Sequence, residues 1–404
     1  MGTGERRRIV GRIGLLWLIV TLVGLAVPSA GQAQEAASTS YEYTFGQQAT
    51  FNLWLPASSM AQEATLFLRI DEDLTRAYTA PVDDGRATYT RALREVPWPP
   101  FATITYWWEY NGQTTARARF LYEDNRFRWQ TRQEGGITVH WVDGDAALMV
   151  NALDIARNAR REIESTLQAP PLDTLSIYIY PSSPDLQSAL RLAGREWVAG
   201  QAYPDLGVIL LAIPPTEGAV LRMRRDIPHE LTHQIHYNLV GDQGYAGQPE
   251  WLVEGLASHF ETTPDPVYAV TLNEARETGQ LIEMTTLCYP FPDDRGRALL
   301  AYAQSQSFVN YLQRTYGWAT MRSLIHAYAD GLDCSAGVEQ TLGMSLPALD
   351  RAWRVWLERT AQGYAEPWSA TAMVMLRDLA PWLTLLALTL LPGAIFVVLT
   401  RLGR

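Results

Sequence analysis

This sequence of 404 residues has no excess of basic side chains and contains no lysine at all. Its 33 basic side chains are all arginine, and 43 carboxylates outnumber them, so the formal net charge is −10. A protein that binds nucleic acid needs a basic surface to neutralise phosphates. The charge balance therefore argues against a nucleic-acid partner. We have no physical account of the missing lysines.

Cysteine is also scarce, because Cys288 and Cys334 are the only two in the chain. Neither belongs to a CxxC pair, so they do not indicate a metal site built on paired thiolates. In an oxidising compartment the two thiols could form one intramolecular disulfide. The alternative is two free thiols in a core.

Two long apolar runs lie at the ends of the chain. The first, residues 13–27, follows four arginines and precedes a stretch of small residues. This pattern predicts a signal peptide over residues 1–33, and an uncleaved anchor is the alternative. The second predicts a transmembrane helix over residues 379–400, with a buried C-terminal core helix as the alternative.

The arginines of the short tail, residues 401–404, set the orientation, because positively charged residues stay on the cytoplasmic side. The sequence thus predicts a single-pass protein of the cell membrane. The chain between the two apolar runs would then be extracytoplasmic. A linker over residues 363–378, which contains proline and serine, would connect it to the membrane.

Short runs of alternating apolar and polar residues fill the first part of that chain. They occur at residues 49–55, 64–70 and 102–108, and turn-forming residues separate the later runs at Asp84-Gly85 and Asn111-Gly112. Short strands at this spacing predict an immunoglobulin-like β-sandwich over residues 40–125.

Residues 130–362 combine strand and helix patterns. Strands are expected at 137–141, 175–180 and 207–213, a long helix at 146–167, and a closing helix at 342–357. The whole chain is therefore predicted to be α+β. A mixed sheet and a helical half would follow the β-sandwich, with one membrane helix at the end.

The segment HELTHQ contains His229 and His233, with Glu230 beside the first histidine. Residues four apart on a helix project from one face about 6 Å apart, close enough to bind one metal ion. The glutamate can then take a proton from a metal-bound water. Pro228, just before the motif, is tolerated by a helix or starts one. Apolar residues at helical spacing favour a packed helix over an ordinary amphipathic one with two surface histidines.

A catalytic zinc ion takes three protein ligands, so the third ligand must come from another element. Glu254, on a helix opened by the segment QPE, is the better candidate, and Glu250 one turn earlier is its rival. His236 lies about 10.5 Å of helix rise beyond His229 and is predicted to pack rather than bind. Glu261 is predicted to orient a histidine from behind.

Together, HELTHQ, PEWLVEGLASHFE and the segment AYAQS with FVNYL resemble the gluzincin zinc metallopeptidases, and the chain is most similar to the peptidase MA-like group. The resemblance covers roughly residues 130–360. It implies a thermolysin-like fold with zinc held by His229, His233 and Glu254. It also implies that Tyr302 donates a hydrogen bond to the oxyanion of the tetrahedral intermediate. The alternative for Tyr302 is a core aromatic.

One segment departs from the pattern of the gluzincin aminopeptidases. Where they carry a glutamate that holds the substrate's amino terminus, residues 200–204 read GQAYP and contain no acid. This departure favours endopeptidase or unspecialised peptidase action. The segment is still expected to form an edge strand that pairs with an extended substrate.

These observations predict a membrane-anchored, extracytoplasmic zinc metallopeptidase that hydrolyses peptide or protein substrates through a zinc-activated water, with Glu230 as general base. The alternative is a catalytically silent, zinc-stabilised binding module in which the β-sandwich performs recognition. A structural zinc site needs neither a base nor an oxyanion donor, so Glu230 and Tyr302 speak against that alternative.

Overall fold

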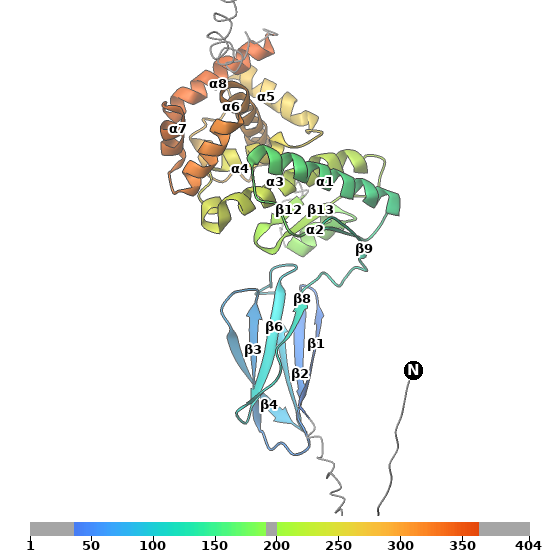
Figure 1. Cartoon of the computed structure of the whole chain (residues 1–404). Helices are drawn as coiled ribbons and strands as arrows, with labels where there is room; N and C mark the ends of the chain where they lie inside the picture. Colours follow the sequence, from blue (N-terminus) through green and yellow to red (C-terminus); the bar gives the residue numbers. More distant parts are fainter. Residues whose placement is uncertain (1–35, 191–199, 363–404) are drawn as a thin grey trace, which may run out of the picture.

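The protein is described by a computed structural model that covers residues 36–190 and 200–362 (Figure 1). A β-sheet unit is followed by an α/β unit and then by a helical half. No helix among these residues combines the length and the apolar character that crossing a bilayer requires. The predicted signal peptide at 1–33 and the predicted membrane helix at 379–400 lie outside the described residues.

The first unit is built from antiparallel strands. They are β1 (Ser38–Thr44), β2 (Gln48–Trp54), β3 (Glu63–Ile70), β4 (Arg76–Asp83), β5 (Arg86–Ala92), β6 (Thr103–Tyr110), β7 (Gln113–Thr114) and β8 (Ala118–Leu121). The strands are hydrogen-bonded in the order β1-β2-β5-β4-β3-β6-β7, and β8 also pairs with β6. Strands β4 and β5 pair through only two residues each, so the sheet folds over at that point. The ring of Phe51 on β2 packs 5.0 Å from that of Tyr106 on β6, which shows that two layers face each other.

Local sequence explains these strands. Along β3, buried Ala64, Leu66 and Leu68 alternate with less buried residues, as a strand with one face in a core requires. The predicted turn at Asp84-Gly85 joins β4 to β5, and both residues have positive φ, which suits a tight hairpin. The N-terminal sheet unit is therefore confirmed, and its immunoglobulin-like class stays a prediction.

The second sheet is mixed and lies between the first unit and the helices (Figure 1). It contains β9 (Gln130–Glu134), β10 (Ile137–Trp141), β11 (Leu175–Tyr180), β12 (Gly200–Tyr203) and β13 (Val208–Ala212). The order is β12-β13-β11-β10-β9, with parallel central strands and antiparallel edges. Helix α1 (Ala146–Leu167) connects β10 to β11, and α2 (Ser183–Leu190) follows β11.

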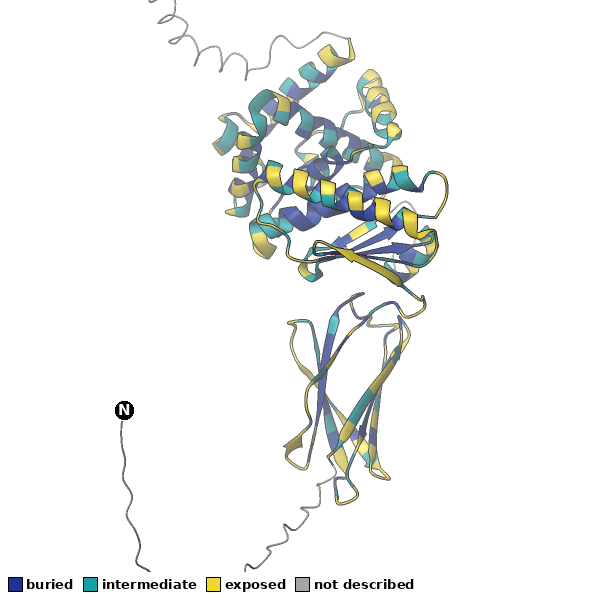
Figure 2. Ribbon diagram, turned by 45° about the vertical axis from the view of Figure 1, so that its right-hand side comes forward, coloured by how far each residue is buried: buried dark blue, intermediate teal, exposed yellow. Residues whose placement is uncertain are grey.

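Both faces of the central strands are buried, which explains why β11 and β13 are almost continuously apolar. On β11, Ile177 and Ile179 face the core shared with α1 and the later helices. Tyr178 and Tyr180 face the opposite way, into the core of the first unit, where the rings of Tyr178 and Phe101 lie 3.9 Å apart. Figure 2 shows these buried strands beside the exposed edge strand β9. The two units therefore share a buried interface.

Helices form the remainder of the described chain. They are α3 (Ala219–Ala246), α4 (Glu250–His259), α5 (Pro266–Thr278), α6 (Arg295–Ala329), α7 (Cys334–Leu342) and α8 (Leu346–Ala361), with short 3-10 turns η1 (Pro204–Leu206) and η2 (Thr286–Cys288). The closing helix predicted at 342–357 was placed too early, because Gly343 at φ 70° ends α7 and α8 starts only at Leu346.

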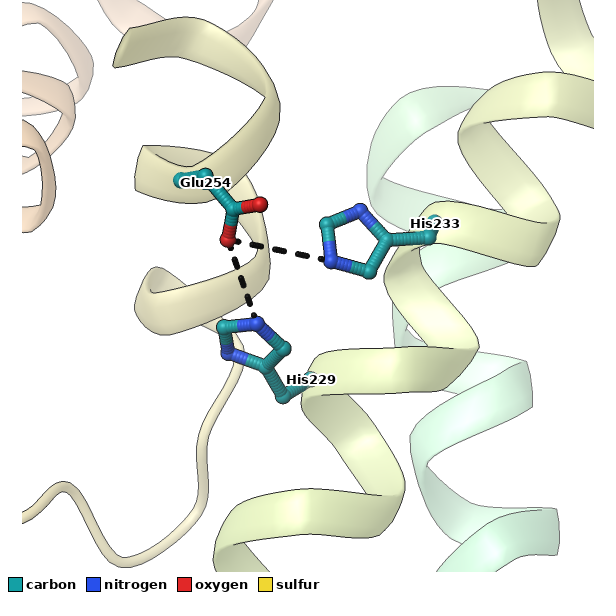
Figure 3. A group of neighbouring side chains, drawn as sticks. All are labelled: His229, His233 and Glu254. Carbon is teal, nitrogen blue, oxygen red and sulfur yellow. Dashed lines mark ion pairs between the residues drawn. The ribbon is translucent and has the colours of Figure 1, made fainter. Parts of the chain in front are cut away.

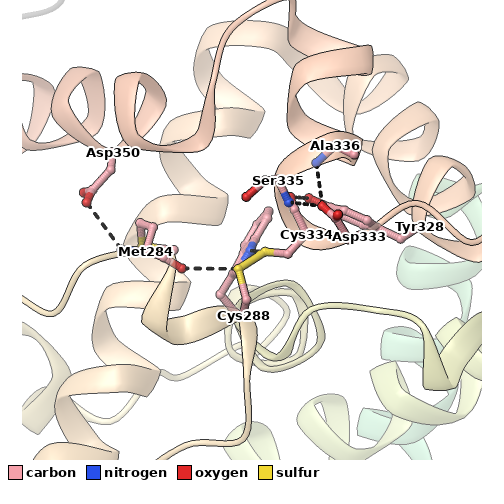
Figure 4. Close-up of a disulfide and its surroundings, with 9 residues drawn as sticks. Met284, Cys288, Tyr328, Asp333, Cys334, Ser335, Ala336 and Asp350 are labelled. Atoms are coloured by element: carbon pink, nitrogen blue, oxygen red, sulfur yellow. Dashed lines mark hydrogen bonds between the residues drawn. A yellow bond between two sulfur atoms is a disulfide. The ribbon is translucent and has the colours of Figure 1, made fainter.

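A disulfide joins Cys288 to Cys334, at the two ends of the segment that contains α6 (Figure 4). The predicted pairing is thus confirmed, and the alternative of two free thiols is not what the structure contains. The loop it closes spans 46 residues. Closing a loop of this length stabilises the fold by about 4 kcal/mol in the chain-entropy description.

The helix that carries the histidine motif begins earlier than the proline suggested. Helix α3 starts at Ala219, so Pro228 lies inside it and not at its first turn. Proline has no N–H, which leaves the carbonyl oxygen of Arg224 without its helical donor. The N–H of Thr262 donates to that oxygen at 3.0 Å. The missing N–H of Pro228 thereby allows the chain after α4 to form a hydrogen bond with α3.

Candidate metal centre and active site

Helix α3 presents two histidine rings to one point. His229 and His233 lie one turn apart, with ring centroids 5.1 Å from each other. Apolar side chains of the same helix, including Ile227, Leu231 and Ile235, are fully buried and fix its rotation against the sheet. The helix prediction based on apolar spacing is therefore confirmed.

Helix α4 supplies the third group of the cluster (Figure 3). The Glu254 Oε2 atom lies 3.3 Å from His229 Nε2 and 3.8 Å from His233 Nε2. One ligand atom from each of the three residues lies within 4.8 Å of the others. Glu250, the predicted rival of Glu254, is not part of this cluster.

A glycine next to Glu254 allows α4 to approach α6 closely. A Cβ atom at Gly255 would lie 2.7 Å from both the Ser305 carbonyl oxygen and the Val309 Cγ2 atom. Such contacts are prohibitive for any larger residue, because the nearest atoms include backbone. Gly255 therefore permits the short distance between α4 and α6. This packing helps to place Glu254 beside His229 and His233.

Each histidine is supported from behind by a different group. His229 donates from Nδ1 to Glu261 Oε1 at 2.9 Å, as the sequence predicted for Glu261. His233 Nδ1 lies 3.0 Å from the hydroxyl oxygen of Tyr245, a contact the sequence analysis missed. In both cases the Nδ1 contact turns Nε2 toward Glu254.

Tyr245 reaches His233 only because α3 bends. The two residues are 12 positions apart, or about 18 Å along a straight helix. Gly241 lies between them at φ 73° and ψ 175°, a conformation that glycine adopts without strain. The last turn of α3 therefore changes direction after Gly241 and brings Tyr245 to the ring. No spacing rule in the sequence predicts such a bend.

Glu230 lies beside the cluster and is 8 % exposed. Burial, together with the nearby carboxylates of Glu254 and Asp226, raises the pKa of its carboxyl to about 8. Strand β12 passes directly over it, since a Cβ atom on Gly200 would lie 2.5 Å from Glu230 Oε1. The edge strand predicted at residues 200–204 is therefore present as β12 and adjoins Glu230.

Tyr302 lies on α6, with its ring centroid 6.3 Å from that of His229. Burial raises the pKa of its hydroxyl well above the usual value, and the carboxylate of Glu254 raises it further. The hydroxyl is thus a neutral hydrogen-bond donor. Tyr302 packs edge-on against Phe291 and also lines the cavity described next.

An open cavity of about 470 Å³ lies next to the cluster. Its walls include Gly200, Arg225, Asp226, His229, Glu230, Glu261, Asp265, Tyr268, Arg295 and Tyr302. A wider cavity of about 790 Å³, lined by Arg322 and His326 among others, contains none of the predicted site residues. The predicted site residues His229, Glu230 and Tyr302 therefore line the smaller cavity.

His236 stands apart from the cluster, as predicted. It is fully buried, and burial lowers the pKa of its ring to about 3. Its ring meets that of Tyr245 edge-on at 5.3 Å, and Gln248 lies nearby without making a well-formed hydrogen bond to either ring nitrogen. His236 is thus a packing residue behind His233.

Charged residues beside the motif were also missed by the sequence analysis. Arg225 donates to Asp226 Oδ1 and to Asp265 Oδ2, both at 2.6 Å. A signal for this network existed in the sequence, because Arg225 and Asp226 are adjacent residues of opposite charge just before the histidine motif. Their partner Asp265, 40 positions away, could not be recognised without the fold.

Comparison with known proteins gives one family match. A family model described as Peptidase MA superfamily matches residues 156–359. No curated protein matches the chain.

Solved structures with some similarity include an M1 zinc metallopeptidase from Deinococcus radiodurans. It is 13 % identical, with 78 % of this chain and 92 % of that chain covered and a TM-score of 0.35. An aminopeptidase N family protein from Idiomarina loihiensis is 8 % identical, with 86 % and 75 % covered and a TM-score of 0.30. A carbohydrate-binding module of family 56, a β-1,3-glucan binding domain, is 12 % identical, with 21 % and 96 % covered and a TM-score of 0.17.

Proposed function

The chain belongs to the Peptidase MA superfamily, and on this basis we propose that it hydrolyses peptide bonds with a zinc ion bound by His229, His233 and Glu254. One observation carries the proposal. The ligand atoms of these three residues lie within 4.8 Å of one another, and Glu230 lines the cavity that adjoins them.

The donor set fits a zinc ion. Two imidazole nitrogens and one carboxylate oxygen are a known ligand set of catalytic zinc, which keeps a further position open. The Oε2 atom of Glu254 is buried and accepts no hydrogen bond from a described residue, which is costly unless a cation occupies the point it faces. When bound, zinc would act as a Lewis acid on the scissile carbonyl and on the attacking water.

Glu230 would then transfer the proton, and Tyr302 would stabilise the developing negative charge. Glu230 would accept the proton of the attacking water at its carboxylate and return it to the leaving amine nitrogen. Tyr302, whose hydroxyl stays protonated, would donate a hydrogen bond to the carbonyl oxygen as that oxygen becomes negative. Strand β12 offers its outer edge to an extended peptide passing over Glu230.

The test uses purified protein loaded with zinc. We expect Glu230→Gln to retain the metal but to lose at least about 100-fold of the peptide cleavage rate, because the general base is gone. Zinc content by mass spectrometry and cleavage of a peptide library measure the two properties separately. Equal turnover by Glu230→Gln and the parent would contradict the assignment.

The same experiment separates the proposal from the alternative of a silent binding module. Tyr302→Phe keeps the ring but removes the donor, so we expect slower cleavage with unchanged zinc content. A parent protein that binds zinc stoichiometrically yet cleaves no peptide in the library would favour the binding module.

We also infer that the peptidase is extracytoplasmic and anchored to the cell membrane by residues 379–400. The disulfide between Cys288 and Cys334 supports an oxidising compartment. The full chain should sediment with membranes, whereas a chain ending at residue 370 should be released. A full chain found entirely in the soluble fraction would contradict this inference.

A further inference from the structure

A buried carboxylate atom in the cavity lacks a partner. Asp226 is 6 % exposed, and its Oδ2 atom accepts no hydrogen bond from any described residue. Its other oxygen, Oδ1, accepts from Arg225 at 2.6 Å. A buried carboxylate oxygen without a donor is costly, so its presence in a ligand cavity points to a group that arrives with the ligand.

Among the described residues, two carboxylates share one guanidinium group beside this atom. Arg225 is shared between Asp226 and Asp265, so one guanidinium group faces two carboxylates. Asp226 and Asp265 therefore carry two negative charges against the single positive charge of Arg225 that they share, and a cation beside Asp226 would offset the remaining charge.

We propose that Asp226 binds a cationic group of the peptide substrate, either a free α-ammonium group or a lysine or arginine side chain. This inference rests on the proposed peptidase function and names its substrate class. Both sources present N–H donors and a positive charge to the free carboxylate oxygen. Asp226 would take the place of the acid that the segment at 200–204 does not provide.

The position of Asp226 limits where that cation can be. Asp226 and Glu230 are four residues apart on α3, about 6 Å along the helix axis. An extended peptide advances about 3.3 Å per residue. The cation should therefore lie within about two residues of the bond that Glu230 helps to hydrolyse.

The first test needs no variant. Zinc-loaded parent protein is given a peptide library, and the cleaved sequences are then made as matched pairs. One pair replaces lysine near the cleaved bond by norleucine, and the other acetylates the amino terminus. We expect kcat/KM to be about ten- to hundredfold higher for the charged member of one pair, the range for a charged hydrogen bond. The pair that responds identifies the source of the cation.

The second test changes the protein. Asp226→Asn keeps the shape and removes the charge, so the ratio of kcat/KM between charged and neutral members should fall to near one. Asp242→Asn is the matched control, because Asp242 is exposed on the same helix and is not among the cavity walls. It should keep the ratio of the parent. Thermal unfolding checks that Asp226→Asn is folded.

The outcomes distinguish this inference from the proposed function. A parent protein that cleaves peptides with equal kcat/KM for charged and neutral members overturns the role of Asp226 and leaves the peptidase function standing. A zinc-loaded parent that cleaves no peptide overturns both. A charge preference that survives in Asp226→Asn also overturns the role of Asp226.

Discussion

The two histidines of the cluster are alike in type but differ in how the fold holds them. His229 is backed by a carboxylate, Glu261, which follows α4. His233 is backed by a neutral phenol, Tyr245, which belongs to the same helix beyond a bend. A carboxylate forms a stronger, charge-assisted hydrogen bond with an imidazole N–H than a hydroxyl does.

The difference extends to the surroundings of each ring. On the His229 side lie the charged residues Arg225, Asp226 and Asp265 and the open cavity. On the His233 side lie the buried ring of His236 and the ring of Tyr237, both packed on Tyr245. His229 therefore faces the cavity with charged residues around it, whereas His233 is set in an aromatic cluster. This contrast predicts unequal effects when each support is removed.

The largest effect should follow from Glu261→Ala. Loss of the carboxylate leaves the Nδ1–H of His229 without its acceptor, and supports of this kind are worth about 10- to 100-fold in metal affinity. We expect a loss near 100-fold in zinc affinity, measured by competition with a chelator. Glu261→Gln keeps an acceptor without the charge and should lose less.

Glu250→Gln is the control for that experiment. Glu250 lies on α4 one turn before Glu254, and burial raises its pKa to about 7, but it is not part of the group formed by His229, His233 and Glu254. Its substitution should leave zinc affinity within about twofold of the parent. A loss as large as that caused by Glu254→Gln would instead establish Glu250 as a ligand.

A smaller effect is expected on the free energy of unfolding at acidic pH, and it involves His236, which packs behind His233. Burial lowers the pKa of His236 to about 3 in the folded protein, against about 6.5 in an unfolded chain. Below pH 6.5 the unfolded chain therefore binds a proton that the folded protein does not. The contribution of His236 to stability is complete above pH 6.5 and declines as the pH falls toward 3.

His236→Phe removes this dependence while keeping an aromatic ring against Tyr245. Between pH 7 and pH 5, the parent should lose about 2 kcal/mol more unfolding free energy than the variant. Urea unfolding at the two pH values measures the difference. Equal losses would mean that His236 is protonated in the folded protein or already neutral in the unfolded one.

Elements and residues with a local sequence pattern could be predicted, whereas contacts between distant segments could not. The strands Ile137–Trp141 and Leu175–Tyr180 and the helix Ala146–Leu167 match their predicted bounds, because apolar periodicity is a local property. His229, His233 and Glu254 were also recognisable, since two lie one helical turn apart and the third belongs to a distinctive following segment.

The remainder depended on contacts between distant or bent segments. Tyr245 is near His233 only because Gly241 takes a positive φ. A lone glycine in a helix pattern does not predict a bend. Pro228 was predicted to be tolerated by a helix or to start one, but the N–H of Thr262 compensates for its missing donor and lets α3 begin two turns earlier. Neither interaction has a signature in local sequence.

The smallest effect should come from Tyr245→Phe. For Nε2 of His233 to bind a cation, Nδ1 must carry the proton and donate it to the Tyr245 oxygen. Removing a neutral acceptor costs about 1 kcal/mol, so zinc affinity should fall by about five- to tenfold, less than in Glu261→Ala. Tyr237→Phe, which alters a ring beside Tyr245 without touching His233, should change nothing. A loss in Tyr245→Phe equal to that in Glu261→Ala would show that charge behind the ligand is irrelevant, and the contrast between the two histidines would be only geometric.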